Sequence, residues 1–240
     1  MRRIVKGEEP PSLTAHREGR TAPAADGEAA TTPSWSNYLQ TDDARWCVRQ
    51  EQRQLCAFCQ GSIEHGKRGI KLAHVVPQRG TELGNDLQLR WSNIVGVCLG
   101  GQETNRPRIL HCDSLQGNRP LSPQLDPVQF VNGSLYYNSD GEIHSLDPAV
   151  EHQLEHVLGL NRKPVLRKRL DALDGEDGIK NLVNNSPAPE QKRRELIALL
   201  DPDNPSDAPL LEYADFLLWH LRYGKLSALA KVSQMGNGLP

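Results

Sequence analysis

The pattern of apolar and polar positions divides the chain into a part with short strands and a later part made of helices. Two short apolar runs, at 70–76 and 94–98, lie among glycine-rich turns, which predicts strands. Before them, a polar segment with an acidic start near residue 42 predicts a helix that leads to Cys56. After residue 137, the pattern predicts helices at 148–160, 163–173, 187–200 and 208–223. The expected fold class is therefore α+β, with a mostly helical C-terminal module.

Changes in composition indicate where these parts begin and end. Residues 15–34 are rich in Ala, Thr, Gly, Glu and Pro and have no apolar face, which is typical of an exposed linker. The segment before it has a more specific composition, and either a frayed terminus or a docking arm fits it. The predicted division is an arm at 1–14, a flexible linker at 15–39, a core at 40–125 and a helical module at 126–240.

The net charge of the whole chain says little about function, whereas the charge of one segment is informative. The 28 Lys and Arg residues nearly balance 30 Asp and Glu residues, so the net charge of -2 indicates no class of partner. Residues 44–119, however, contain 11 basic and 6 acidic residues, and their excess of +5 favours weak phosphate contact in the core. No run approaches the ~20 apolar residues that span a bilayer. The start of the chain also lacks the apolar segment of a secretory signal, so we expect a cytoplasmic protein with no membrane partner.

Four of the five cysteines predict a metal site. Cys56 and Cys59 form a C-x-x-C pair, and Cys98 and Cys112 complete a 57-residue stretch, whereas Cys47 lies outside it. An odd number of cysteines with this clustering favours a four-thiolate zinc site over a disulfide scaffold. Two alternatives remain at this point. The four residues can be small buried hydrophobes, or His111 can replace Cys112 as the fourth ligand.

Three polar residues stand at the ends of the predicted strands and of the next helix. His74 lies near the end of the first strand, Asn93 precedes the second, and Asp113 follows Cys112 at the start of a helix-compatible segment. A lone histidine is more often a packed or surface residue than a catalyst. Together with Asn93 and Asp113, however, His74 can form a site that has a base, an orienting amide and a ligand for a divalent cation.

The combined motifs resemble the HNH nucleases of the ββα-metal fold. The resemblance is stronger to one branch, the HNH subunit of Septu-type anti-phage defence systems, which also occurs with some retrons (PtuB-like). It implies a zinc-stapled ββα-metal (HNH) core and metal-dependent hydrolysis of nucleic-acid phosphodiesters, with DNA as the first choice and RNA, including tRNA, as the alternative. The motifs that carry it are MRRIVKGEEPPSL, CAFC, AHVVPQ, NIVGVC, HCDSLQGN, LYYNSDGEIHSLDP, VLGLN and LLEYADFLLWHL.

The resemblance implies a role for each matching residue. His74 stands at the position of the general base, Asn93 at that of the residue that holds the loop and the base, and Asp113 at that of a ligand to the catalytic cation, Mg²⁺ or another divalent ion. It also implies an ABC/SMC-type ATPase partner (PtuA-like) in a heteromeric complex, with the N-terminal arm as the docking segment. The four residues that match the structural Zn²⁺ knuckle are Cys56, Cys59, Cys98 and Cys112, with an insertion at 99–111.

Ala73 departs from the family pattern. The residue before the base is usually Asp or Glu in this family and binds the metal, and a methyl group cannot do so. Three explanations compete: a natural variant with weaker metal binding, a ligand supplied by Glu64 or Glu82, or a deliberate substitution that silences the nuclease. The alternative function is therefore a zinc-binding interaction subunit with a silenced nuclease site.

Basic residues are concentrated around the predicted His74 site. Lys and Arg supply most of the affinity for nucleic acid by contacting phosphates, although solvated surface charge is the commoner meaning of such residues. Their concentration in one segment favours substrate steering. The candidates are Arg49, Arg53, Lys67, Arg68, Lys71 and Arg79.

Overall fold

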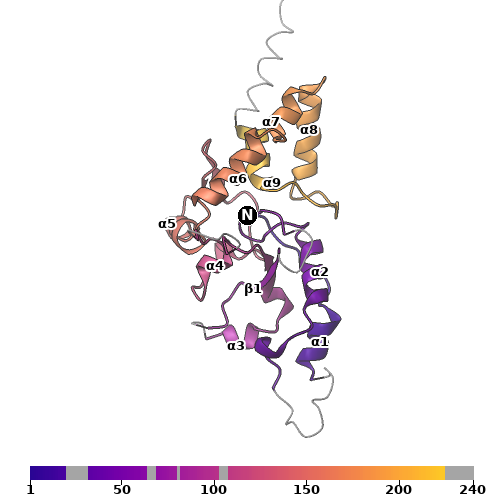
Figure 1. The fold of residues 1–240 in the computed structure, drawn as a ribbon, viewed down its shortest axis with the longest axis vertical. Helices are drawn as coiled ribbons and strands as arrows, with labels where there is room; N and C mark the ends of the chain where they lie inside the picture. The colour runs from indigo at the N-terminus through magenta and orange to yellow at the C-terminus, as the bar shows by residue number, and fades with distance from the viewer. Residues whose placement is uncertain (20–31, 64–68, 80–81, 103–107, 225–240) are drawn as a thin grey trace, which may run out of the picture.

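The computed structural model describes residues 1–19, 32–63, 69–79, 82–102 and 108–224, and its secondary structure is of the mixed α and β kind expected. Two small two-stranded sheets accompany a larger number of short helices (Figure 1). The strands are β1 (Lys71–His74), β2 (Ile94–Val97), β3 (Tyr136–Tyr137) and β4 (Ile143–His144). The helices are α1 (Pro11–Arg17), α2 (Asp42–Glu51), α3 (Gly84–Leu87), α4 (Asp113–Gln116), α5 (Pro148–His152), α6 (Lys163–Asp174), α7 (Ile179–Asn184), α8 (Pro189–Leu200) and α9 (Ala214–Tyr223), with short 3₁₀ turns at Trp35–Asn37, Trp91–Asn93 and Pro123–Leu125.

Strands β1 and β2 form the antiparallel hairpin that the two apolar runs predict. The register pairs Lys71 with Val97 and His74 with Ile94. All four residues of β2 are buried, which explains why this strand is continuously apolar instead of alternating. Gly96 favours close packing here, because an added Cβ would lie only 3.0 Å from the Val48 side chain on α2. The missing side chain therefore lets α2 lie directly against the hairpin.

In the view of Figure 1, α1 and α2 lie on one side of β1, and α4 lies on the other. The helices α6 to α9 gather at one end of the molecule, and α3 lies near the opposite end. Gln52, just after α2, joins the helix to the hairpin: its side chain accepts a 2.7 Å hydrogen bond from Gly96 N and donates one of 2.7 Å to Gly96 O. This paired contact fixes the position of β2 relative to α2.

The C-terminal module is helical as predicted, but its boundaries differ. The segment predicted as one helix at 148–160 contains α5 followed by a π-helical turn (Gln153–Val157), and α7 was not predicted. Helix α9 begins at Ala214 and not at 208, because Tyr213 has a φ of +58°, a left-handed conformation that no α-helix can pass through. None of the helices in the described ranges is both long enough and apolar enough to cross a membrane.

The N-terminal segment packs against the rest of the chain. Met1, Ile4 and Leu13 are buried, and Ile4 N donates a 2.8 Å hydrogen bond to Pro127 O. The predicted boundary between arm and linker at 14/15 falls inside α1. Near the other end of the predicted linker, the 3₁₀ turn Trp35–Asn37 is formed, so this part of the segment is structured because its aromatic residues pack onto the core. Residues 20–31 of the predicted linker lie outside the described residues.

Candidate zinc centre and His74 site

The four predicted cysteines converge in the core. Their sulfur atoms all lie within 4.8 Å of one another, and in the described part of the chain this is the one group of three or more His, Cys, Asp or Glu side chains arranged to hold a metal ion. The Sγ–Sγ distances are 3.9 Å for Cys56–Cys112, 3.7 Å for Cys59–Cys98 and 3.8 Å for Cys98–Cys112. Zn–S bonds of about 2.3 Å in a tetrahedron require sulfur atoms about 3.8 Å apart. The cluster therefore fits a structural zinc ion.

The backbone on each side of the cluster is bent to aim the sulfur atoms inward. After the first pair, Gln60 adopts a φ of +64°, and Gly61 N donates a 3.4 Å hydrogen bond to the Cys59 sulfur. After Cys98, Gly100 also has a positive φ, and an added Cβ would lie 2.4 Å from His111 O. This close approach brings the two ends of the 99–111 insertion together. Consequently, Cys112 reaches Cys98 although 13 residues separate them.

The fourth sulfur atom belongs to Cys112. His111 Nδ1 lies 3.2 Å from Cys112 Sγ, so the imidazole is a neighbour of the cluster and not a member of it. Burial raises the pKa of the Cys112 thiol, because a thiolate loses its hydration there. As thiolates the four cysteines would require a cation, and zinc would supply the positive charge and hold the three chain segments together.

His74 lies at the end of β1 with one ring nitrogen already occupied. Its Nε2 atom is 2.9 Å from Gln88 O, and since a carbonyl oxygen only accepts, Nε2 carries the hydrogen. Burial lowers the pKa of His74, and the hydrogen bond to Gln88 and the charge of Asp113 act in the opposite direction. The ring is therefore neutral at pH 7, and its Nδ1 atom has a free lone pair. This is the form required of a general base.

Asn93 holds the loop that follows β1. Its side-chain oxygen accepts a 2.8 Å hydrogen bond from Val76 N, and its amide donates to Val76 O at 3.1 Å and to Leu87 O at 3.2 Å. Its own carbonyl accepts from Val75 N at 3.0 Å. Asn93 is 5% exposed, so these bonds are made away from water. It thereby fixes the chain directly after His74 without contacting that ring.

Replacing Asn93 with alanine is expected to lower the free energy of unfolding by about 2–3 kcal/mol, because three buried hydrogen bonds of about 1 kcal/mol each are lost. Urea denaturation measures this change. Asn184→Ala is the matched control, since Asn184 is exposed at the end of α7 and its loss is expected to cost under about 0.5 kcal/mol. Equal effects of the two substitutions would contradict the positioning role of Asn93.

Asp113 is the first residue of α4, and it is paired with a lysine. Its Oδ2 atom lies 2.9 Å from Lys71 Nζ, which also donates to Ser114 Oγ at 3.1 Å. Side chains alternate along a strand, so Ala73 shares a face of β1 with Lys71. Ala73 is 3% exposed, and its methyl group offers no ligand. A catalytic cation would therefore find few ligands here. Asp113 supplies the one carboxylate, and the ammonium group of Lys71 already neutralises its charge.

Of the two alternative carboxylates, Glu64 and Glu82, the structure describes only Glu82. Glu82 is exposed, two residues before α3. Glu64 lies outside the described residues. Among the described residues, the side chains around Asp113 form no group of three metal ligands. The described residues do not fit the cation site that the resemblance to HNH nucleases implies.

The residues predicted to contact nucleic acid lie in different structural environments. Arg49 donates to Ile63 O at 3.2 Å, Lys71 is paired with Asp113, and Arg79 is exposed beyond β1. Arg53 lies beyond the end of α2, where a positive φ of 49° turns the chain. Lys67 and Arg68 lie outside the described residues.

Sequence reasoning missed Trp35, which lies in the segment predicted as a linker. Its ring packs edge-on against His74, with ring centroids 4.6 Å apart. Together with the hydrogen bond to Gln88, this contact fixes the plane of the imidazole. An isolated aromatic pair, Trp35 and Tyr38, inside a polar, alanine-rich segment was the available signal.

Comparison with known proteins gives one informative similarity. A protein of Escherichia coli named "Retron Ec83 putative HNH endonuclease" is 34% identical to this chain over 77 residues. The match covers 30% of this chain and 30% of that protein. No protein-family model matches the chain. The similarity is therefore partial, and it concerns a protein named as an HNH endonuclease from a retron.

Proposed function

We propose that this chain is an HNH endonuclease that hydrolyses phosphodiester bonds in nucleic acid, with DNA as its first substrate and RNA or tRNA as the alternative. The observation that carries the proposal is the arrangement around the β1–β2 hairpin. His74 ends β1, Asn93 precedes β2, and Asp113 begins α4 next to the cysteine cluster. The partial similarity to a protein named as an HNH endonuclease supports it.

The chain's own residues suit the hydrolytic step. His74 Nδ1 would accept a proton from water as the water oxygen forms a bond to phosphorus, while the P–O bond to the leaving oxygen breaks and that oxygen takes a proton from solvent. Asn93 and Trp35 hold the loop and the ring. A divalent cation supplies charge neutralisation in nucleases of this kind. Since Ala73 and the Lys71–Asp113 pair do not fit such an ion, cleavage by this chain is expected to be slow.

A second candidate function is that of a zinc-binding interaction subunit whose nuclease site is silent. The ion pair between Lys71 and Asp113 favours it, because the lysine already neutralises the carboxylate that a cation would use. In both cases we propose a role in anti-phage defence with an ABC/SMC-type ATPase as partner. The resemblance to Septu-type subunits and the retron origin of the similar protein support this role.

Replacing His74 with alanine is expected to eliminate cleavage. Supercoiled plasmid, linear DNA and tRNA are incubated with the full chain in Mg²⁺ or Mn²⁺, with and without the ATPase, and the products are separated on gels. The parent protein is expected to give slow cleavage, and the loss of the base costs about 10²- to 10⁴-fold. His152→Ala, at the end of α5, is the control. Cleavage that survives His74→Ala would contradict the proposed base, and no cleavage under any condition would favour the interaction subunit.

A further inference from the structure

A cavity of about 560 Å³ lies away from the residues of the His74 site. It is enclosed by the N-terminal segment at 2–7, the C-terminal half of α2 and the loop that joins α8 to α9. His74, Asn93 and Asp113 are not among its lining residues. Its volume falls within the range of cavities that bind small molecules. A ligand there would not contact these three residues, although Cys56 of the cysteine cluster and Arg53, one of the candidate nucleic-acid contacts, also line the cavity.

The lining of this cavity is positively charged. Four cationic side chains line it, and two carboxylates oppose them. One of these carboxylates, Glu51, is already engaged by Lys6 Nζ at 2.6 Å and by Trp91 Nε1 at 2.9 Å. Arg2 is likewise paired with Asp215 at 2.8 Å, and the excess that remains, of Arg3 and Arg53 over Asp207, favours an anionic ligand. The cationic residues are Arg2, Arg3, Lys6 and Arg53, and the carboxylates are Glu51 and Asp207.

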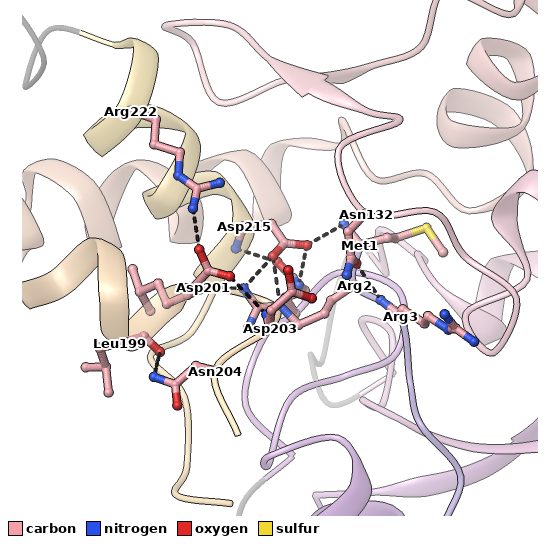
Figure 2. A network of polar contacts seen from close by, with 12 residues as sticks. Met1, Arg2, Arg3, Asn132, Leu199, Asp201, Asp203, Asn204, Asp215 and Arg222 are labelled. Carbon is pink, nitrogen blue, oxygen red and sulfur yellow. Dashed lines mark hydrogen bonds and ion pairs between the residues drawn. The ribbon is translucent and has the colours of Figure 1, made fainter. Parts of the chain in front are cut away.

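Two of the arginines each keep a buried nitrogen without a hydrogen-bond partner, namely Nη1 of Arg2 and Nη2 of Arg53. Each guanidinium is held by other contacts. Arg2 Nε donates to Asp215 Oδ1 at 2.9 Å (Figure 2), and Arg53 Nε donates to Ala208 O at 2.7 Å. An unpaired buried donor costs about 1–3 kcal/mol. Both nitrogens are shielded from solvent in this conformation, so an anion in the cavity would pair with them once the guanidinium groups turn toward it.

The two guanidinium groups also affect each other electrostatically. Burial lowers the pKa of Arg53, and the nearby charge of Arg2 lowers it further. Two arginine side chains that line one cavity, each with a donor unused, are typical of sites that bind phosphate through arginine. A phosphate would relieve this repulsion.

An exposed aromatic ring stands at the same cavity. Trp46, on α2, lines it and is 61% exposed, which is unusual for a tryptophan. Val5 is 75% exposed and lines the same cavity. A flat apolar ring next to cationic groups suits a nucleobase, since bases stack on aromatic side chains. These features together indicate a ligand with both a phosphate and a base.

We propose that this cavity binds a nucleoside phosphate, with the phosphate held by Arg2 and Arg53 and the base stacked on Trp46. Two sources share this chemistry: a free mononucleotide and the phosphorylated end of a nucleic-acid strand. In either case the ligand would join the N-terminal segment to the α8–α9 loop. Its binding would be measurable without any cleavage.

Isothermal titration calorimetry of the full chain, in buffer without added divalent cations, tests the proposal. The ligands are AMP, a 5′-phosphorylated tetranucleotide, the same tetranucleotide without phosphate, adenosine and inorganic phosphate. At least one of the two phosphorylated nucleoside ligands is expected to bind at least about tenfold more tightly than adenosine or phosphate. Binding of AMP alone would identify the free nucleotide as the source, and binding of the tetranucleotide alone would identify the strand end.

Substitutions locate the site. Arg53→Gln is expected to weaken binding at least about tenfold, and Trp46→Ala about fivefold or more. Arg194→Gln, which removes the same charge from an exposed position on α8, is expected to leave binding unchanged. Arg53→Lys keeps the charge but not the planar group and is expected to fall between the parent and Arg53→Gln. Thermal unfolding of each variant verifies that it is folded.

Several results would overturn the proposal. They are the absence of binding by either phosphorylated ligand, equal affinity in the parent and Arg53→Gln, and inorganic phosphate that binds as tightly as AMP. A short polyglutamate peptide that binds as tightly as AMP would also overturn it, because the site would then take an acidic protein segment.

Discussion

Replacing Cys112 with serine is expected to release zinc and to unfold the core around the β1–β2 hairpin. The cluster joins three chain segments, which carry Cys56 and Cys59, Cys98, and Cys112, and structural zinc in small domains contributes on the order of 10 kcal/mol. This is comparable to the whole free energy of unfolding of a typical domain, about 5–15 kcal/mol. Metal analysis of the parent should give one zinc ion per chain, and the variant should contain less than about a tenth of that amount.

Cys47→Ser is the matched control, because Cys47 is half-buried on α2 and lies outside the cluster. It is expected to keep its zinc and to change the free energy of unfolding by about 1 kcal/mol or less. Thermal unfolding followed by circular dichroism, with and without a chelator, compares the three proteins. A Cys112→Ser variant that stays folded and free of zinc would show that the four cysteines are only a packed group.

Replacing Ala73 with glutamate is expected to raise Mg²⁺-dependent cleavage at least tenfold, which corresponds to about 1.4 kcal/mol of transition-state stabilisation. The new carboxylate would share the face of β1 that carries Lys71, next to Asp113. Two carboxylates bind a divalent cation far better than one that is already neutralised by a lysine. Plasmid and tRNA cleavage rates measure the gain.

Ala73→Gln has nearly the same shape without the charge, so it separates the effect of a ligand from that of a larger side chain. It is expected to give no gain in cleavage. The double variant Ala73→Glu with His74→Ala is expected to be inactive. Mg²⁺ should raise the melting temperature of Ala73→Glu and not that of Ala73→Gln, since a cation would compensate the buried carboxylate. Equal cleavage by the two variants, or none by either, would contradict the idea that position 73 lacks a ligand.

The elements with strong local signals could be predicted from the sequence. The two apolar runs contain strands β1 and β2, and helix α2 begins at the predicted acidic start, Asp42. The cysteine spacing predicted a cluster, and its convergence is confirmed. Each of these predictions depends on a short stretch of chain whose own periodicity or spacing decides the outcome.

The features that sequence reasoning missed depend on contacts between distant segments. The contact of Trp35 with His74 crosses 39 residues, and the ion pair of Lys71 with Asp113 crosses 42. The end of α2 at Glu51, after which the chain turns at Arg53, is another such feature. Periodicity carries no information about where a helix stops when tertiary contacts decide it.

Asp215 connects parts of the chain that are synthesised at very different times. Its carboxylate accepts hydrogen bonds from Arg2 Nε at 2.9 Å and from Gln60 Nε2 at 2.9 Å, and Gln60 directly follows the first cysteine pair (Figure 2 for Arg2). On the ribosome, both residues emerge long before Asp215. The N-terminal segment and the first half of the zinc site therefore cannot form these hydrogen bonds until α9 has been synthesised. For the proposed nuclease, such a fold delays completion of the site until α9 has left the ribosome.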